Sequence, residues 1–212
     1  MLTAGDMDTN TILPPWPSPE FENINVLLAS NSPRRRQLLH FILPHFEIAD
    51  NKDVDESYPA TLTPEQVPAF VAGLKANAHR SSLTDDELMI TADTVVILDG
   101  RIYGKPHSRC EALDMIGKLS GRTHKVVTGV ALTMPGHNCD IFSETTLVEF
   151  ANLSPQEIET YVDIFKPYDK AGAYGVQEWI GAVGIKSITG CFYNVMGLPL
   201  HTLYTHLTKL LH

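Results

Sequence analysis

The chain has 212 residues, of which 43% are hydrophobic, and its formal net charge at pH 7 is -9. This composition suits one sizeable globular domain, and the acidic balance argues against a general nucleic-acid binder. No apolar run is long enough to cross a membrane, and no signal-peptide pattern opens the chain. The three cysteines are far apart and lack metal-binding spacing, which predicts a reducing, cytoplasmic setting.

Residues 1–23 are expected to form a tail without regular structure of its own. The segment is rich in proline and has few apolar side chains, among which Trp16 is a candidate to anchor it. We expect residues 24–212 to form a single domain.

The first predicted strand and helix enclose a candidate anion site. Val26 to Ala29 form an apolar run that predicts a buried strand, and Ser32 followed by Pro33 predicts the start of a helix, with Leu38, Leu39, Phe41 and Ile42 on its apolar face. The loop between them would direct backbone N–H groups and polar side chains to one point: Ser30, Ser32, Arg34, Arg35 and Arg36. This predicts either a phosphate-binding site or a capped helix whose basic first turn is simply solvated, and the residues alone do not favour one over the other.

An acidic segment and a second helix follow. Residues 50–57 include Asp55 and Glu56, and they form either a solvated acidic loop, which charge pattern alone favours, or oxygen ligands for a divalent cation. Pro68 predicts that the helix after Thr63 begins only near this proline. Its apolar face is predicted to contain Phe70, Val71, Leu74 and Ala78. Lys75 lies beside that face, where a lysine usually extends to water.

Asp93 interrupts an apolar β pattern. We predict strands over 88–90 and 95–98, separated by residues 91–94. A buried carboxylate needs a cation, a helix end or a metal, whereas an aspartate in a turn needs none of these. Asp99-Gly100 predicts a hairpin, and Lys105 follows it at a position from which it could reach a phosphate.

The remaining chain alternates helices and strands, which indicates an α/β protein without fixing its topology. Predicted helices begin after Ser108, Ser154 and Pro199, and predicted strands cover 124–134 and 139–150, with a last hairpin over 183–196. The predicted buried residues of the last two helices include Phe165 and Tyr204. The loop 168–177 contains two glycines, which permit close backbone approach to a ligand. The sequence contains no Walker A loop, no G-x-G-x-x-G and no nucleophile motif.

Several motifs from Val26 onward resemble those of the Maf family of nucleoside triphosphate pyrophosphatases. They are L-A-S-N-S-P-R-R-R-Q-L-L (28–39), D-E-S (55–57), the A-x-x-K-A helix pattern (72–76), A-D-T-V-V with a following G-K-P (92–106), D-K-A-G-A-Y-G-V-Q (169–177) and V-M-G-L-P-L (195–200). One departure is Glu178-Trp179, where the family often carries glycine.

The resemblance implies an α/β fold in which an elongated mixed β-sheet is flanked by helices, with two lobes around a cleft, similar to the inosine triphosphatase fold. It implies hydrolysis of a nucleoside triphosphate to a monophosphate and pyrophosphate, and a homodimer. Asp93 would be the proton acceptor, with Lys75 and Lys105 as further catalytic groups. A magnesium or manganese ion would bind Glu56, Asp93 and Asp55. The implied substrate-binding residues are Ser30, Ser32, Arg34, Arg35, Thr94 and Gln177.

Arg34, Thr94 and Gln177 match the branch of that family that prefers dTTP and UTP. The branch that acts on modified purine nucleotides tends to carry tryptophan, glutamine and glutamate instead. Three alternatives stay open: a pyrophosphatase for modified purines, a nucleotide-binding inhibitor of septum formation without turnover, and a phosphatase that releases orthophosphate.

Overall fold

A mixed seven-stranded sheet forms the centre of the computed structural model, which describes residues 23–50 and 52–211. Trp16 and nearly all of the predicted tail lie outside the described residues. The strands are β1 (Asn25–Ala29), β2 (Glu47–Ile48), β3 (Glu87–Leu98), β4 (Arg101–Tyr103), β5 (Thr123–Thr133), β6 (Asp140–Phe150) and β7 (Ile185–Thr189). Their order is β2-β1-β3-β5-β6-β7, with β4 paired to β3. β1 runs parallel to β2 and β3, and the other pairs are antiparallel.

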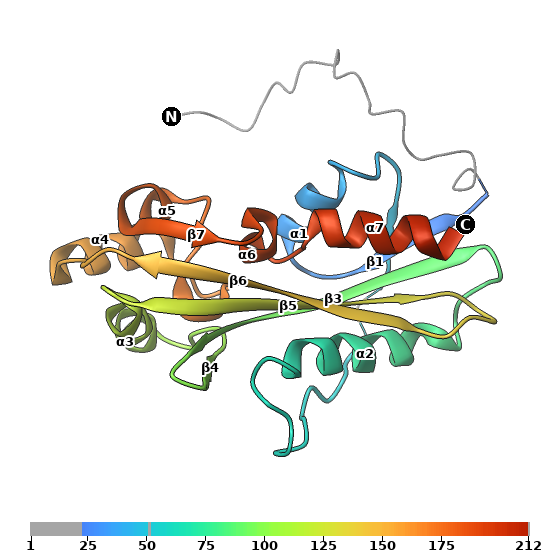
Figure 1. The fold of residues 1–212 in the computed structure, drawn as a ribbon, viewed down its shortest axis with the longest axis horizontal. Helices are drawn as coiled ribbons and strands as arrows, with labels where there is room; N and C mark the ends of the chain where they lie inside the picture. The colour runs from blue at the N-terminus through green and yellow to red at the C-terminus, as the bar shows by residue number, and fades with distance from the viewer. Residues whose placement is uncertain (1–22, 51, 212) are drawn as a thin grey trace, which may run out of the picture.

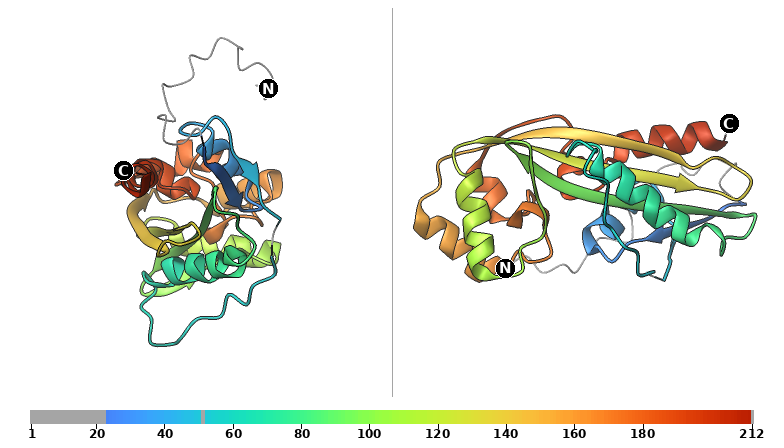
Figure 2. Two further views of the ribbon diagram at one scale, coloured as in Figure 1. Left: turned by 90° about the vertical axis from the view of Figure 1, so that its right-hand side faces the viewer. Right: turned by 90° about the horizontal axis from the view of Figure 1, so that it is seen from below.

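Helices cover both faces of this sheet. They are α1 (Pro33–Leu39), α2 (Val67–Arg80), α3 (Arg109–Leu119), α4 (Pro155–Phe165), η2 (Ala171–Ala173), α5 (Trp179–Gly184), α6 (Phe192–Met196) and α7 (Leu200–Leu211). In Figure 1, α2 lies below the long strands, α1 and α7 lie above them, and α3, α4 and α5 gather at one end. The views in Figure 2 show the same elongated arrangement from the end and from below. The predicted α/β class with an elongated mixed sheet is therefore confirmed.

The hydrophobic interior has two main centres, one at each end of the sheet. One contains Leu28 of β1, Leu38 of α1 and Leu203 of α7, all fully buried. The other contains Ile116 of α3 and Tyr161 of α4. β3 and β5 contribute side chains to both centres, so the two lobes share a continuous sheet.

The predicted helix starts are largely confirmed. The Ser32 hydroxyl accepts a hydrogen bond from the Arg35 N–H at 3.4 Å, so α1 begins at Pro33. α4 begins after Ser154 as predicted, and Ser154 forms a reciprocal capping box with Glu157. α2 begins at Val67, next to the proline that prevents an earlier start. Within the described residues, no helix has both the length and the apolar character needed to cross a membrane.

Two strand predictions are wrong. β3 is continuous, because residues 91–94 pair with β5, and Asp93 therefore lies within a strand and not in a turn. The hairpin predicted over 183–196 is instead the end of α5, then β7 and α6. A Cβ at Gly181 would lie 1.8 Å from the Val176 carbonyl oxygen, so α5 packs on backbone at a position where only glycine fits.

Some residues that were predicted to lie in the core are exposed or only half-buried. Phe41 is 59% exposed because α1 ends at Leu39, and Phe165 and Tyr204 are 37% and 40% exposed. The buried face of α2 is formed by Val67, Val71, Ala72, Ala76 and His79, whereas Phe70, Leu74 and Ala78 are only half-buried. Small side chains occupy much of this helix face because α2 approaches β5 closely.

Candidate active site

A cavity of about 900 Å³ lies between the two lobes. Its walls come from the β1–α1 loop, α2, β3, the segment after β4 and the loop before α5. It gathers most of the residues predicted from sequence: Ser30, Ser32, Arg34, Arg35, Glu56, Lys75, Asp93, Thr94, Lys105 and Gln177. Residues far apart in the sequence thus line one cavity.

Lys75 links two carboxylates in this cavity. Its Nζ lies 3.0 Å from Asp93 Oδ1 and 3.0 Å from Glu56 Oε1. The Thr91 hydroxyl donates to the Ala72 carbonyl at 2.8 Å, which fixes α2 against β3 and places Lys75 over Asp93. Lys75 therefore does not simply extend to water. Its ammonium balances the negative charge that Asp93 places within β3.

Of the three carboxylates predicted to bind a divalent cation, two line the cavity and one does not. Asp55 does not line the cavity, and its carboxylate accepts a hydrogen bond from the Ser57 N–H at 2.9 Å, which lowers the pKa of Asp55. Within the described part of the chain, no three acidic, histidine or cysteine side chains form a ready metal site. Glu56 and Asp93 remain as hard oxygen donors. Two carboxylates that leave further positions for phosphate oxygens and water are typical of Mg²⁺ sites.

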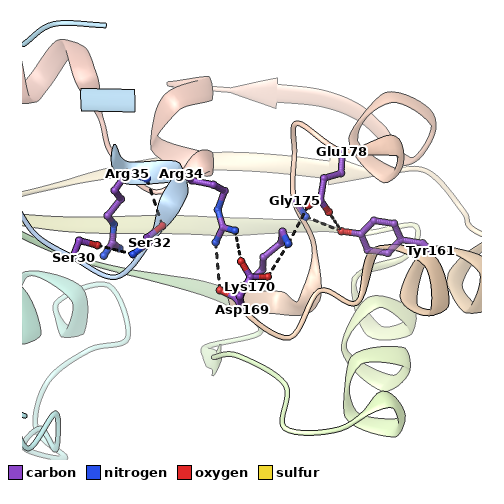
Figure 3. Close-up of polar contacts among 9 residues, drawn as sticks. All are labelled: Ser30, Ser32, Arg34, Arg35, Tyr161, Asp169, Lys170, Gly175 and Glu178. Carbon is purple, nitrogen blue, oxygen red and sulfur yellow. Dashed lines mark hydrogen bonds and ion pairs between the residues drawn. The ribbon is translucent and has the colours of Figure 1, made fainter. Parts of the chain in front are cut away.

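The serine hydroxyls shape the anion loop. Ser30 Oγ accepts a hydrogen bond from the Ser32 N–H at 3.2 Å, and Ser32 Oγ caps α1. Arg36 Nη2 donates to the Ser30 carbonyl at 3.3 Å from outside the cavity lining. The loop therefore stays tight at the start of the helix, as Figure 3 shows.

Arg35 anchors this loop to the sheet. Its guanidinium donates to the carbonyls of Gly197 and Ala92 and to the Thr94 hydroxyl, each at 2.8 Å. Burial lowers the pKa of Arg35, and the nearby Asp93 opposes that shift. The Thr94 hydroxyl also bonds to Thr128 at 3.0 Å. Because side chains alternate along a strand, Asp93 and Thr94 leave β3 on opposite faces.

Arg34 reaches across the cavity to the other lobe. Its Nη1 lies 2.6 Å from Asp169 Oδ2, and its Nη2 donates to the Asp169 carbonyl at 3.3 Å (Figure 3). Burial acts to raise the pKa of Asp169, but hydrogen bonds from Lys170 and Arg34 outweigh it, and the pKa is lowered. Gln177 is exposed in the same loop, and Lys105 is exposed at the rim.

Sequence reasoning assigned no role to several residues that support this wall. Asp169 and Lys170 open the D-K-A-G-A-Y-G-V-Q motif, so the motif itself was the available signal. Glu178 was visible as a departure from the family pattern. Burial of Tyr161 in α4 was predicted, but the role of its hydroxyl had no local signal because its hydrogen-bond partners lie outside this helix.

Comparisons with known proteins agree with this architecture. A family model described as Maf-like protein matches residues 25–210. The chain is 50% identical over 189 residues to a dTTP/UTP pyrophosphatase of Phocaeicola vulgatus, covering 89% of this chain and 97% of that protein. A protein of the same name from Porphyromonas gingivalis is 52% identical over 186 residues, covering 86% and 92%.

Among solved structures, the Staphylococcus aureus Ham1 protein aligns with a TM-score of 0.51 at 19% identity, covering 87% of this chain and 98% of that chain. This likeness shows a shared fold. The family match and the two sequence relatives extend over nearly the whole described region, including every wall of the cavity. The chain belongs to the Maf family.

Proposed function

We propose that this chain hydrolyses dTTP and UTP to the nucleoside monophosphate and pyrophosphate. The observation that carries the proposal is the placement of a basic helix start opposite a pair of carboxylates joined by Lys75, across one cavity. The names of the relatives at about half identity supply the substrate class.

The charges of the cavity suit a triphosphate. Such a chain carries about four negative charges near neutral pH, and cations are needed to hold it during in-line attack. Arg34, Lys75 and Lys105 supply positive charge around the cavity. When bound by Glu56 and Asp93, Mg²⁺ or Mn²⁺ would neutralise charge on the phosphate oxygens.

Asp93 is the residue best placed to take a proton from the attacking water. Its Oδ1 accepts a hydrogen bond from Lys75 at 3.0 Å, which fixes the orientation of the carboxylate and leaves Oδ2 for the water. Attack at the α phosphorus breaks the bond to the bridging oxygen, and pyrophosphate leaves with that oxygen.

Base selection falls to Gln177 and Arg34, which both line this cavity. Uracil and thymine present two carbonyl acceptors around an N3–H donor. An arginine only donates, whereas a glutamine amide both donates and accepts, so together they match this edge. A base that left these groups unpaired would be rejected.

Product analysis tests the reaction directly. Chromatography of dTTP digests should show dTMP and pyrophosphate, and a chelator should abolish turnover. The specificity constants for dTTP and UTP should lie well above those for ATP, GTP and 7-methyl-GTP. Orthophosphate with dTDP, full activity in chelator, or equal rates on all triphosphates would contradict the proposal.

We also propose that the protein forms a homodimer in a reducing compartment. The family resemblance supports the dimer, and the free state of Cys110, Cys139 and Cys191 suits that compartment. Light scattering at working concentration should give twice the 23.4 kDa chain mass.

A further inference from the structure

The loop that carries Gln177 is held in place by a half-buried carboxylate, that of Glu178. Glu178 has only 18% of its side chain exposed, and both of its carboxylate oxygens have partners. Oε1 lies 3.0 Å from Lys170 Nζ, and Oε2 accepts a short hydrogen bond from the Tyr161 hydroxyl (Figure 3). We call Tyr161, Lys170 and Glu178 the loop support.

Tyr161 ties the two ends of the loop together. Its hydroxyl accepts a hydrogen bond from the Gly175 N–H at 3.0 Å while it donates to Glu178. Burial, together with the hydrogen bond to Glu178, raises the pKa of Tyr161, so the hydroxyl stays protonated as a donor. The Glu178 N–H donates to the Gly175 carbonyl at 3.0 Å and closes the turn. Gln177 therefore lies inside a turn that is fixed at both ends.

The packing around this turn leaves little room for movement. A Cβ at Gly175 would lie 2.8 Å from Glu178 Cδ and 3.1 Å from Gln177 Nε2. The carboxylate thus lies directly against the backbone next to the base-reading amide. Lys170 extends the connection to Asp169, which pairs with Arg34, so the support links both proposed base-reading side chains.

We propose that Glu178 is a positioning residue for base selection, which acts through Tyr161 and Lys170 on the Gln177 loop. This inference rests on the proposed reading of the base by Gln177. A neutral amide at position 178 satisfies only one of the two donors that face the carboxylate, so the turn loses one of its ties. The effect should fall on recognition of uracil and thymine and not on the chemistry at Asp93.

The test compares five proteins. They are the wild type, Glu178→Gln, Tyr161→Phe, the double variant that combines these two changes, and Glu149→Gln as a control. Glu149 on β6 is a matched control, because its oxygens also bind one ammonium and one hydroxyl, from Lys186 at 2.6 Å and Ser187 at 3.0 Å. It does not line the cavity. The measurements are kcat and KM for dTTP and GTP, and hydrogen exchange of the peptide that spans 174–178.

For Glu178→Gln we expect KM for dTTP to rise about tenfold, with kcat within about twofold and KM for GTP unchanged. The KM of the double variant for dTTP should be no higher than that of the more strongly affected single variant, because both changes release the same turn. Exchange in the 174–178 peptide should increase in these variants and not in Glu149→Gln.

Equal changes in KM for dTTP and GTP would show that Glu178 acts by its charge, and would overturn the proposal. Additive effects, or unchanged exchange in the 174–178 peptide, would overturn it as well. If the wild type does not prefer dTTP to GTP, the proposed base selection fails, and the exchange data still decide whether Glu178 holds the loop.

Discussion

The ion pair between Asp93 and Lys75 determines where the acidic groups of the cavity lie. A carboxylate within a sheet strand is costly without a partner, and Lys75 Nζ at 3.0 Å supplies that partner from the neighbouring helix. The same ammonium also holds Glu56, which comes from an exposed loop. Two acidic groups are thereby kept at one point of the cavity, where a phosphate chain would arrive.

Replacing Asp93 by asparagine should lower kcat by about 100-fold or more, because the amide is nearly isosteric but cannot act as a base. Steady-state kinetics with dTTP and circular dichroism would measure the change. Asp99→Asn is the control: Asp99 lies in the turn directly after the same strand, is exposed, and has a positive φ of 51° that asparagine tolerates. Activity of Asp93→Asn within a few-fold of the wild type would rule out its role as proton acceptor.

Replacing Gln177 by glutamate should narrow the preference for dTTP over GTP by roughly tenfold, since a carboxylate only accepts hydrogen bonds and leaves a base carbonyl unpaired. The ratio of the two specificity constants is the quantity to measure. Gln156→Glu, at an exposed position on α4, introduces the same charge away from the cavity and should leave that ratio unchanged. An unchanged ratio in Gln177→Glu would mean that the side chain serves only the loop.

At the level of elements, the contact between α2 and β5 positions the lysine. Gly129 of β5 faces the first turn of α2, and a Cβ there would lie 2.2 Å from the Ala69 nitrogen and 2.4 Å from the Pro68 oxygen. The helix therefore lies directly on the strand. This close approach also explains why Ala72 and Ala76, and not Leu74 or Phe70, pack against Ala131 of β5.

Gly129→Ala should destabilise the protein by about 1–3 kcal/mol, because backbone atoms of α2 must move to admit the methyl group. It should also reduce activity, since α2 carries Lys75. Gly117→Ala provides the control, because Gly117 lies on the exposed side of α3 with open space around it. Alanine there should raise the free energy of unfolding by about 0.5–1 kcal/mol. Urea unfolding would measure both, and equal stability of the two variants would contradict the packing argument.

Sequence patterns predicted elements well where the signal was local. Ser32-Pro33, Ser154-Pro155 and Asp99-Gly100 each specify a boundary within a few residues, and all three boundaries are found. The predicted break at 91–94 is wrong because pairing with β5 along this whole stretch overrides the weak strand preference of Ala92 and Asp93. Site residues with a motif were gathered correctly, whereas Tyr161 depends on a contact between distant elements.

At the scale of the whole molecule, a buried histidine links pH to stability. His124 of β5 is 2% exposed, its Nε2 lies 2.7 Å from the Tyr174 hydroxyl, and its Nδ1 has no hydrogen-bond partner among the described residues. Burial lowers the pKa of His124 from 6.5 to about 4. The folded protein therefore resists a proton that the unfolded chain accepts.

Between pH 6.5 and about 4 the unfolded state binds this extra proton, so the free energy of unfolding should fall as the pH falls through that window. The loss should reach about 3 kcal/mol near pH 4, and stability above pH 6.5 should be unaffected. Urea unfolding at several pH values would show the slope. His124→Gln should flatten it, whereas His45→Gln, at an exposed position, should not. A wild type with no slope in this window would refute the assignment.

The alternation of side chains along β3 has an evolutionary consequence. Position 93 belongs to the face of the strand that Lys75 contacts, and position 94 belongs to the face that Arg35 contacts. In the proposed mechanism, substitutions at position 94 leave the proton acceptor at position 93 in place, so relatives could diverge in substrate preference and keep the same reaction. Deletion of a single residue from the strand would exchange the two faces and remove both functions at once, and natural selection should tolerate substitutions here but not changes in length.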